Sequence, residues 1–140
     1  MFQKGRETFL DSTDQFYEDP PAVDAKIYND ALIAKYSNNI RMAGDLCRSA
    51  NIKSYFFCEP VPFYKSPKPA SQAYKGNFQR FDYIYPELEK NKDSLANFHF
   101  LGNLMENEKN FYYFSHTFYS PALSAKVANE ILNTIKNDLQ

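Results

Sequence analysis

Glycine is scarce in this chain. Only four of the 140 residues are glycine, whereas an average usage of about 7% would give roughly ten. A glycine-rich loop lets the backbone approach phosphate groups closely, and both mononucleotide and dinucleotide motifs depend on such a loop. Because the sequence offers none, we expect no nucleotide-binding motif and no cofactor.

The chain also lacks an excess of charge of either sign. Sixteen Lys and Arg residues stand against seventeen Asp and Glu, which gives a net charge of −1. No basic field therefore argues for nucleic acid or an anionic membrane as a partner. The apolar runs are shorter than the roughly 20 residues that span a bilayer, and the first six residues lack the apolar core of a signal peptide. We expect a cytoplasmic protein with neither kind of partner.

Cysteine is limited to Cys47 and Cys58, which fall on an expected helix and an expected strand. Their spacing fits no metal-ligand motif. We interpret both as buried free thiols, and we expect no metal site.

Aromatic residues, in contrast, are abundant, with thirteen Phe and eleven Tyr. A core filled by Phe and Tyr, with tyrosines at its rim, explains this content most simply. Stacking on sugars or bases is the alternative.

The length predicts a single domain over residues 1–140. Apolar spacing and chain breakers predict alternating strands and helices: a strand near 7–11, a helix over about 23–50, a strand over 52–58, a helix over about 72–92, short β-like runs at 98–101 and 111–114, and a helix after Pro121. This alternation predicts an α/β fold, in which an open parallel sheet has helices on both faces.

The terminal helix has the clearest local signal. Ser120 is suited to cap its N-terminus, and Pro121 to its first position, where a missing N–H costs nothing. Apolar residues then recur at steps of three and four. We expect Val127, Ile131 and Ile135 to be buried against the sheet, and Ile131→Ala to cost roughly 2–5 kcal/mol.

Two side chains are candidates for acyl-transfer chemistry. His116 lies in a polar turn after an expected strand, where a general base would be well placed. Ser12 offers a hydroxyl at a strand-to-loop turn and is the candidate nucleophile. The structural alternative for Ser12 is a turn or capping serine. His99, between two phenylalanines, is expected to be a hydrogen-bonded structural residue.

Several segments together resemble the later half of the SGNH (GDSL-type) hydrolases. The stretch Tyr119-Ser120-Pro121 and the helix after it are similar to the end of that domain, and residues 10–17 are similar to its oxyanion-binding block. Asn51-Ile52 and a strand ending in Glu59-Pro60 match a further family pattern. The resemblance implies a three-layer open parallel sheet (SGNH/flavodoxin-like), here lacking the first strands and their Gly-Asp-Ser nucleophile block.

The aligned catalytic positions differ from the family in this sequence. Ser115 stands at the place of the family's Asp, and Phe118 at the place of its His. Asp14 replaces the Asn of the oxyanion block, and an anion there would repel an oxyanion. We expect Phe118 to be packed rather than exposed.

Three functions follow from these observations. The first is an SGNH-like domain that is catalytically impaired, or a fragment of an ester hydrolase. The second is an active esterase with a rearranged site around Ser12 and His116. The third is an aromatic-rich module for sugars or peptides that uses rim tyrosines: Tyr17, Tyr64, Tyr112 and Tyr119.

In each case the expected ligand is a small ester or a carbohydrate. The expected binding residues are Asp14, Glu59 and Tyr119. If the family's first strands are missing, the strand near Glu7 would be an exposed sheet edge. Such an edge predicts a homodimer or a separate partner chain.

Overall fold

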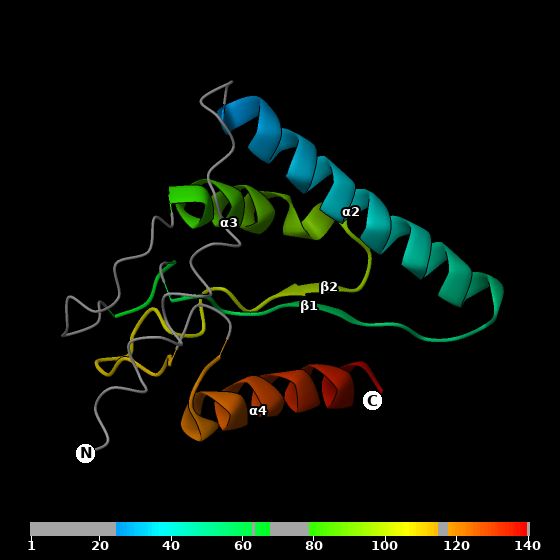
Figure 1. The fold of residues 1–140 in the computed structure, drawn as a ribbon. Helices are drawn as coiled ribbons and strands as arrows, with labels where there is room; N and C mark the ends of the chain where they lie inside the picture. Colours follow the sequence, from blue (N-terminus) through cyan, green and yellow to red (C-terminus); the bar gives the residue numbers. More distant parts are fainter. Residues whose placement is uncertain (1–24, 63, 68–78, 115–117, 140) are drawn as a thin grey trace, which may run out of the picture.

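A computed structural model describes residues 25–62, 64–67, 79–114 and 118–139 (Figure 1). Its elements are, in chain order, helix α2 (Ala25–Ser49), strand β1 (Phe56–Cys58), helix α3 (Gln79–Asn91), the 3-10 helix η1 (Lys92–Ser94), strand β2 (Phe98–Phe100) and helix α4 (Pro121–Asp138). Helix and strand therefore alternate, as predicted. None of the helices in these ranges is long and apolar enough to cross a membrane.

β1 and β2 form a two-stranded parallel sheet. Phe56 pairs with Phe98, and Cys58 pairs with Phe100. Beyond the ladder, the Leu101 N–H donates to the Cys58 carbonyl over 2.9 Å. Figure 1 shows α2 and α3 on one side of the strands and α4 on the other. The described residues thus confirm a mixed α/β class with helices on both sides of a small parallel sheet.

The run at 111–114 does not add a third strand to this sheet. Tyr113 instead forms an isolated antiparallel bridge with Tyr119. The Ser120 N–H donates to the Tyr112 carbonyl over 2.7 Å, and the Phe114 N–H donates to the Phe118 carbonyl over 2.8 Å. Because the paired residues are close in the sequence, their pairing satisfies these main-chain groups at a small cost in loop-closure entropy, and it replaces the predicted parallel pairing.

Helix α2 ends as its sequence predicts. The Ile52 N–H donates to the Cys47 carbonyl over 2.7 Å, and the Asn51 N–H to the Arg48 carbonyl over 3.0 Å. Asn51 itself has a φ of 55°. These features form a Schellman motif, in which the left-handed residue satisfies the last carbonyls of the helix and turns the chain toward β1.

Two apolar cores lie around the strand pair. The first holds α2 and α3 against one face of the sheet, with seven buried members: Ile40, Cys58, Tyr64, Tyr85, Leu88, Leu95 and Phe98. The second holds α4 against the loops near the Tyr113–Tyr119 bridge, with four: Met105, Tyr113, Leu123 and Val127. Pro86 lies inside α3 without splitting it.

Helix α4 confirms its predicted start. The Ser120 hydroxyl accepts the Leu123 N–H over 3.3 Å, and Pro121 occupies the first turn. Val127 is buried, but in the second core rather than against the sheet as expected. Ile131 is half-buried beside that core, and Ile135 is also half-buried. Leu123, one turn before Val127, is the most deeply buried side chain of α4. It belongs to the same core as Met105, and both side chains are fully buried.

Phe118 corrects an expectation: its side chain is 70% exposed rather than packed. Neighbouring residues in extended backbone point to opposite faces. Because Tyr119 packs against the second core, Phe118 points outward. Phe114, which is hydrogen-bonded to Phe118 through the main chain, is likewise 69% exposed.

Candidate ligand site at the carboxyl end of β1

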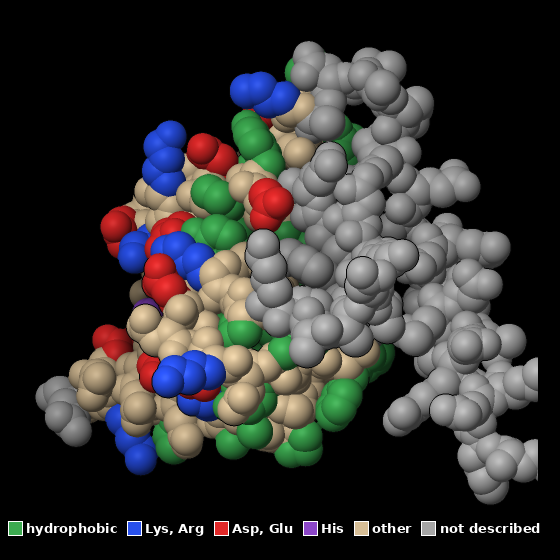
Figure 2. Space-filling view, turned by 90° about the vertical axis from the view of Figure 1, so that its left-hand side faces the viewer, with side chains coloured by type: hydrophobic (Ala, Val, Ile, Leu, Met, Phe, Trp, Pro, Cys, Tyr) green, Lys and Arg blue, Asp and Glu red, His purple; other side chains and the backbone are tan. Residues whose placement is uncertain are grey.

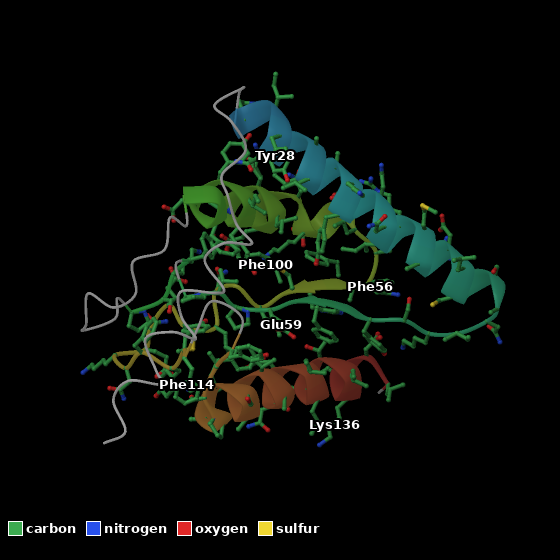
Figure 3. All side chains as sticks on the ribbon, in the orientation of Figure 1. Tyr28, Phe56, Glu59, Phe100, Phe114 and Lys136 are labelled. Carbon is green, nitrogen blue, oxygen red and sulfur yellow. The ribbon has the colours of Figure 1, made fainter. Side chains whose placement is uncertain are left out.

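Glu59 follows β1 directly and joins three segments of the chain. Its carboxylate accepts a hydrogen bond from the Tyr119 hydroxyl over 3.2 Å. Its main-chain carbonyl accepts one from the Tyr85 hydroxyl of α3 over 2.9 Å. Figure 3 places Glu59 between the strands and α4. Two of the predicted binding residues, Glu59 and Tyr119, are therefore brought together at the strand end where open α/β folds hold ligands.

The contact also affects the titration of the phenol. Burial, followed by the charge and hydrogen bond of Glu59, raises the pKa of Tyr119 above its usual value. Tyr119 therefore remains a neutral donor at neutral pH. Glu59 keeps unused acceptor capacity, because a carboxylate has about four lone-pair positions and this side chain is exposed.

A groove of about 330 Å³ opens between α2 and α3, above the carboxyl end of β1. Both helices lie on the same side of the strands (Figure 1). Its walls come from three elements: Leu32, Ile33 and Tyr36 of α2, Ile84, Tyr85 and Leu88 of α3, and residues 57–59. The groove is thus a largely apolar site next to the Glu59 carbonyl.

The buried thiol of Cys58 forms part of this groove. Burial is the main cause that raises its pKa to about 11, although the Tyr85 and Tyr36 hydroxyls lie within hydrogen-bonding reach. Burial likewise raises the pKa of Tyr36 to about 12 and that of Tyr85 still further. Cys58 therefore stays protonated and is no nucleophile at neutral pH. Cys47 is also a free thiol but only half-buried.

A second polar cluster surrounds Glu89 of α3. Its carboxylate accepts hydrogen bonds from the Tyr64 hydroxyl, the Asn103 amide and the Lys65 ammonium, the last over 3.1 Å. These donors, with Tyr64 first, lower the pKa of Glu89 to about 2. The cluster joins the segments that follow β1 and β2 to α3. No sequence motif links these residues, which lie on three segments far apart in the chain, so the cluster could not be predicted.

The Glu89 cluster also corrects the interpretation of Tyr64 as a rim tyrosine. Tyr64 is buried, with its ring 5.3 Å from that of Tyr85 and 6.0 Å from that of Phe100. Tyr112 is half-buried, and its hydroxyl donates to Glu108 over 3.3 Å. These phenols therefore serve packing and internal hydrogen bonds.

His99 is held by ring contacts on the face of the sheet opposite the groove. Its ring stacks on Phe57 at 5.1 Å and lies 6.1 Å from the ring of Tyr55. Tyr55 in turn donates to Asp138 of α4 over 2.7 Å. This position fits the structural role expected for His99. Within the described residues, ring stacking, rather than the expected hydrogen bond, is the contact that holds it.

The predicted catalytic residues Ser12 and His116 lie outside the described residues, as do the binding candidate Asp14 and the rim residue Tyr17. Ser115 and the strand expected near Glu7 also lie outside them. Within the part of the chain that the structure describes, no three His, Cys, Asp or Glu side chains come close enough to hold a metal ion. The described site consists of the groove and the Glu59–Tyr119 contact.

Figure 2 shows positive and negative side chains interspersed over the described part of one face, with apolar side chains between them. That face carries no field of one sign for a strongly charged partner. Comparison with protein-family models, with curated proteins and with solved structures gives no match for this chain.

Proposed function

We propose that this chain is a ligand-binding α/β domain, related in arrangement to the later half of SGNH hydrolases, and that it does not hydrolyse esters. Binding takes place at the carboxyl end of β1. The finer fold that we propose is a three-layer open parallel sheet without the family's first strands. Helices on both sides of a parallel strand pair support this arrangement.

One observation carries the proposal. The residue at the place of the family's catalytic His is Phe118, and its side chain is exposed next to the equally exposed Phe114. A phenyl ring can take no proton from a nucleophile, but it offers a flat apolar face to a ligand. The hydroxyl that follows it, on Tyr119, is already donated to Glu59.

Hydrolysis of p-nitrophenyl butyrate by the purified chain tests this proposal. We expect the rate to equal that of the buffer, and to be the same for the Ser12→Ala and His116→Ala variants. A saturable rate that either substitution abolishes would establish the active esterase instead. Thermal unfolding of each variant is the control: the same cooperative transition as in the unaltered chain would show that a loss of rate reports on chemistry rather than on folding.

Assembly forms a second part of the proposal. If the first strands of the family fold are missing, the strand expected near Glu7 would offer an unpaired edge to a second copy of the chain or to another protein. Light scattering across micromolar concentrations measures the mass directly. A homodimer would agree with this expectation, whereas a monomer that stays soluble throughout would show that the fold closes its own edge.

A further inference from the structure

We propose that the groove between α2 and α3 binds an uncharged, mainly hydrocarbon molecule that carries one hydroxyl or carbonyl group. This inference rests on the proposed binding role, and it names the site and the class of ligand.

The size of the groove limits the ligand. It measures about 330 Å³, near the lower end of the roughly 300–1,000 Å³ range of small-molecule sites. An apolar cavity of about 150 Å³ holds one benzene molecule. The groove therefore suits a molecule with on the order of ten heavy atoms, such as an eight-carbon chain with a small polar head.

The walls favour hydrocarbon. Leu32 and Ile33 of α2 face Ile84 and Leu88 of α3 across the groove, and all four are aliphatic. A polyol such as a sugar would leave most of its hydroxyl groups without partners against these side chains, which is costly. A hydrocarbon chain has no hydrogen bonds to lose there, and burial of its apolar surface away from water is favourable.

The charges exclude ionised head groups. Among the described residues that line the groove, Glu59 is the one that carries a charge. Its carboxylate is directed to Tyr119, toward α4, while the preceding Cys58 side chain belongs to the core under α2 and α3. A carboxylate head in the groove would therefore meet no counter-charge, and an ammonium head would have to leave the aliphatic walls to reach the Glu59 carboxylate. Burial of an unpaired charge against those walls is strongly unfavourable.

Tyr36 supplies the polar contact. Its side chain is 37% exposed, and its hydroxyl lies near the Cys58 thiol, a weak hydrogen-bonding group. The other phenol in the groove, Tyr85, already donates to the Glu59 carbonyl. The Tyr36 hydroxyl is thus the group that can donate to an oxygen of the ligand.

Titration of the full chain with 1-octanol, nonanoate and octylammonium, followed by NMR, tests the proposal, because the three molecules share an octyl chain and differ only in the head group. We expect 1-octanol to give saturable shifts at Leu32, Ile84 and Leu88. Both ions should bind at least about tenfold more weakly. Equal binding of either ion, or shifts confined to other residues, would overturn the assignment.

Two substitutions check the location. Leu32→Phe should fill the groove and abolish the 1-octanol shifts, whereas Tyr36→Phe should weaken binding about fivefold through the loss of one hydrogen bond. Leu132→Phe on the exposed side of α4 is the matched control and should bind normally. If Leu32→Phe binds 1-octanol like the unaltered chain, the groove is not the site.

The outcome is separable from that of the proposed function. Ester turnover would contradict the proposed binding role even if 1-octanol occupied the groove. Conversely, the chain could show no ester turnover and no binding of 1-octanol, but bind another ligand through Phe118. That result would overturn the assignment of the groove and leave the proposed binding role standing.

Discussion

Tyr119 and Glu59 stand 60 positions apart in the sequence, yet the hydroxyl of one donates to the carboxylate of the other over 3.2 Å. This contact ties the segment before α4 to the end of β1. We expect Tyr119→Phe to lower the free energy of unfolding by about 0.5–1 kcal/mol, since the acceptor is exposed and water replaces the donor. Urea unfolding measures the change, and Tyr119→Phe in a Glu59→Gln background should cost less.

Leu123 should be the most sensitive position of α4. Its side chain is fully enclosed against Met105, so we expect Leu123→Ala to cost about 2–5 kcal/mol through lost burial and an unfilled cavity. Ile131→Ala should cost less than Leu123→Ala, because Ile131 is only half-buried. Leu139→Ala, at a 70% exposed position, is the control and should stay within about 0.5 kcal/mol. Equal effects at Leu123 and Leu139, measured by urea unfolding, would contradict the packing of α4.

The lowered pKa of Glu89 predicts that the stability of the fold decreases at low pH. Its pKa falls from 4.5 to about 2 on folding, mainly through the Tyr64 hydrogen bond. The stabilisation is therefore complete above pH 4.5 and is lost as the pH falls through about 2. At pH 6 we expect Glu89→Gln to lower the free energy of unfolding by about 1–2 kcal/mol, an amount reduced by solvent screening.

The same comparison at pH 2 should show a much smaller difference between the two proteins. Other carboxylates with lowered pKa values, such as Asp138 and Glu108, are present in both and cancel. Glu130→Gln, on the exposed side of α4, controls for removal of one negative charge. A Glu89→Gln cost that is independent of pH would show that Glu89 acts through packing alone.

The two thiols should react at different rates. Cys58 is buried, and burial raises its pKa to about 11, whereas Cys47 is half-buried on α2. A short pulse of iodoacetamide under native conditions should modify Cys47 first, because alkylation needs an accessible thiolate. Mass spectrometry counts the modified sites. In urea both should react, and a Cys47→Ser variant that is labelled rapidly under native conditions would contradict the buried position of Cys58.

Local signals in the sequence predicted the helices well. Ser120 and Pro121 fixed the start of α4 through a cap that needs only neighbouring residues, and Asn51 marked the end of α2 in the same way. The strands at 56–58 and 98–100 were also predictable, because aromatic residues favour extended backbone and each strand contains two phenylalanines. These features depend on contacts within a few positions.

Features that depend on distant partners could not be predicted. The Glu89 cluster needs three segments to meet, and none of Tyr64, Lys65 or Asn103 carries a motif. The run at 111–114 has the composition of a strand, but it pairs with residues 118–120, which are close to it in the sequence, rather than with β1 or β2. For the same reason Glu59 and Tyr119 could be predicted as separate binding residues, but their contact with each other could not.

Asn51 and Asn97 both have left-handed backbone, with φ values of 55° and 56°, at the turns before β1 and β2. Within the described residues no glycine occupies such a conformation. Asparagine tolerates it at a modest cost, but it has fewer conformations than glycine in the unfolded chain. Each asparagine therefore trades a little native strain for a smaller loss of entropy on folding. A chain with so few glycines can in this way form tight turns while losing less conformational entropy on folding.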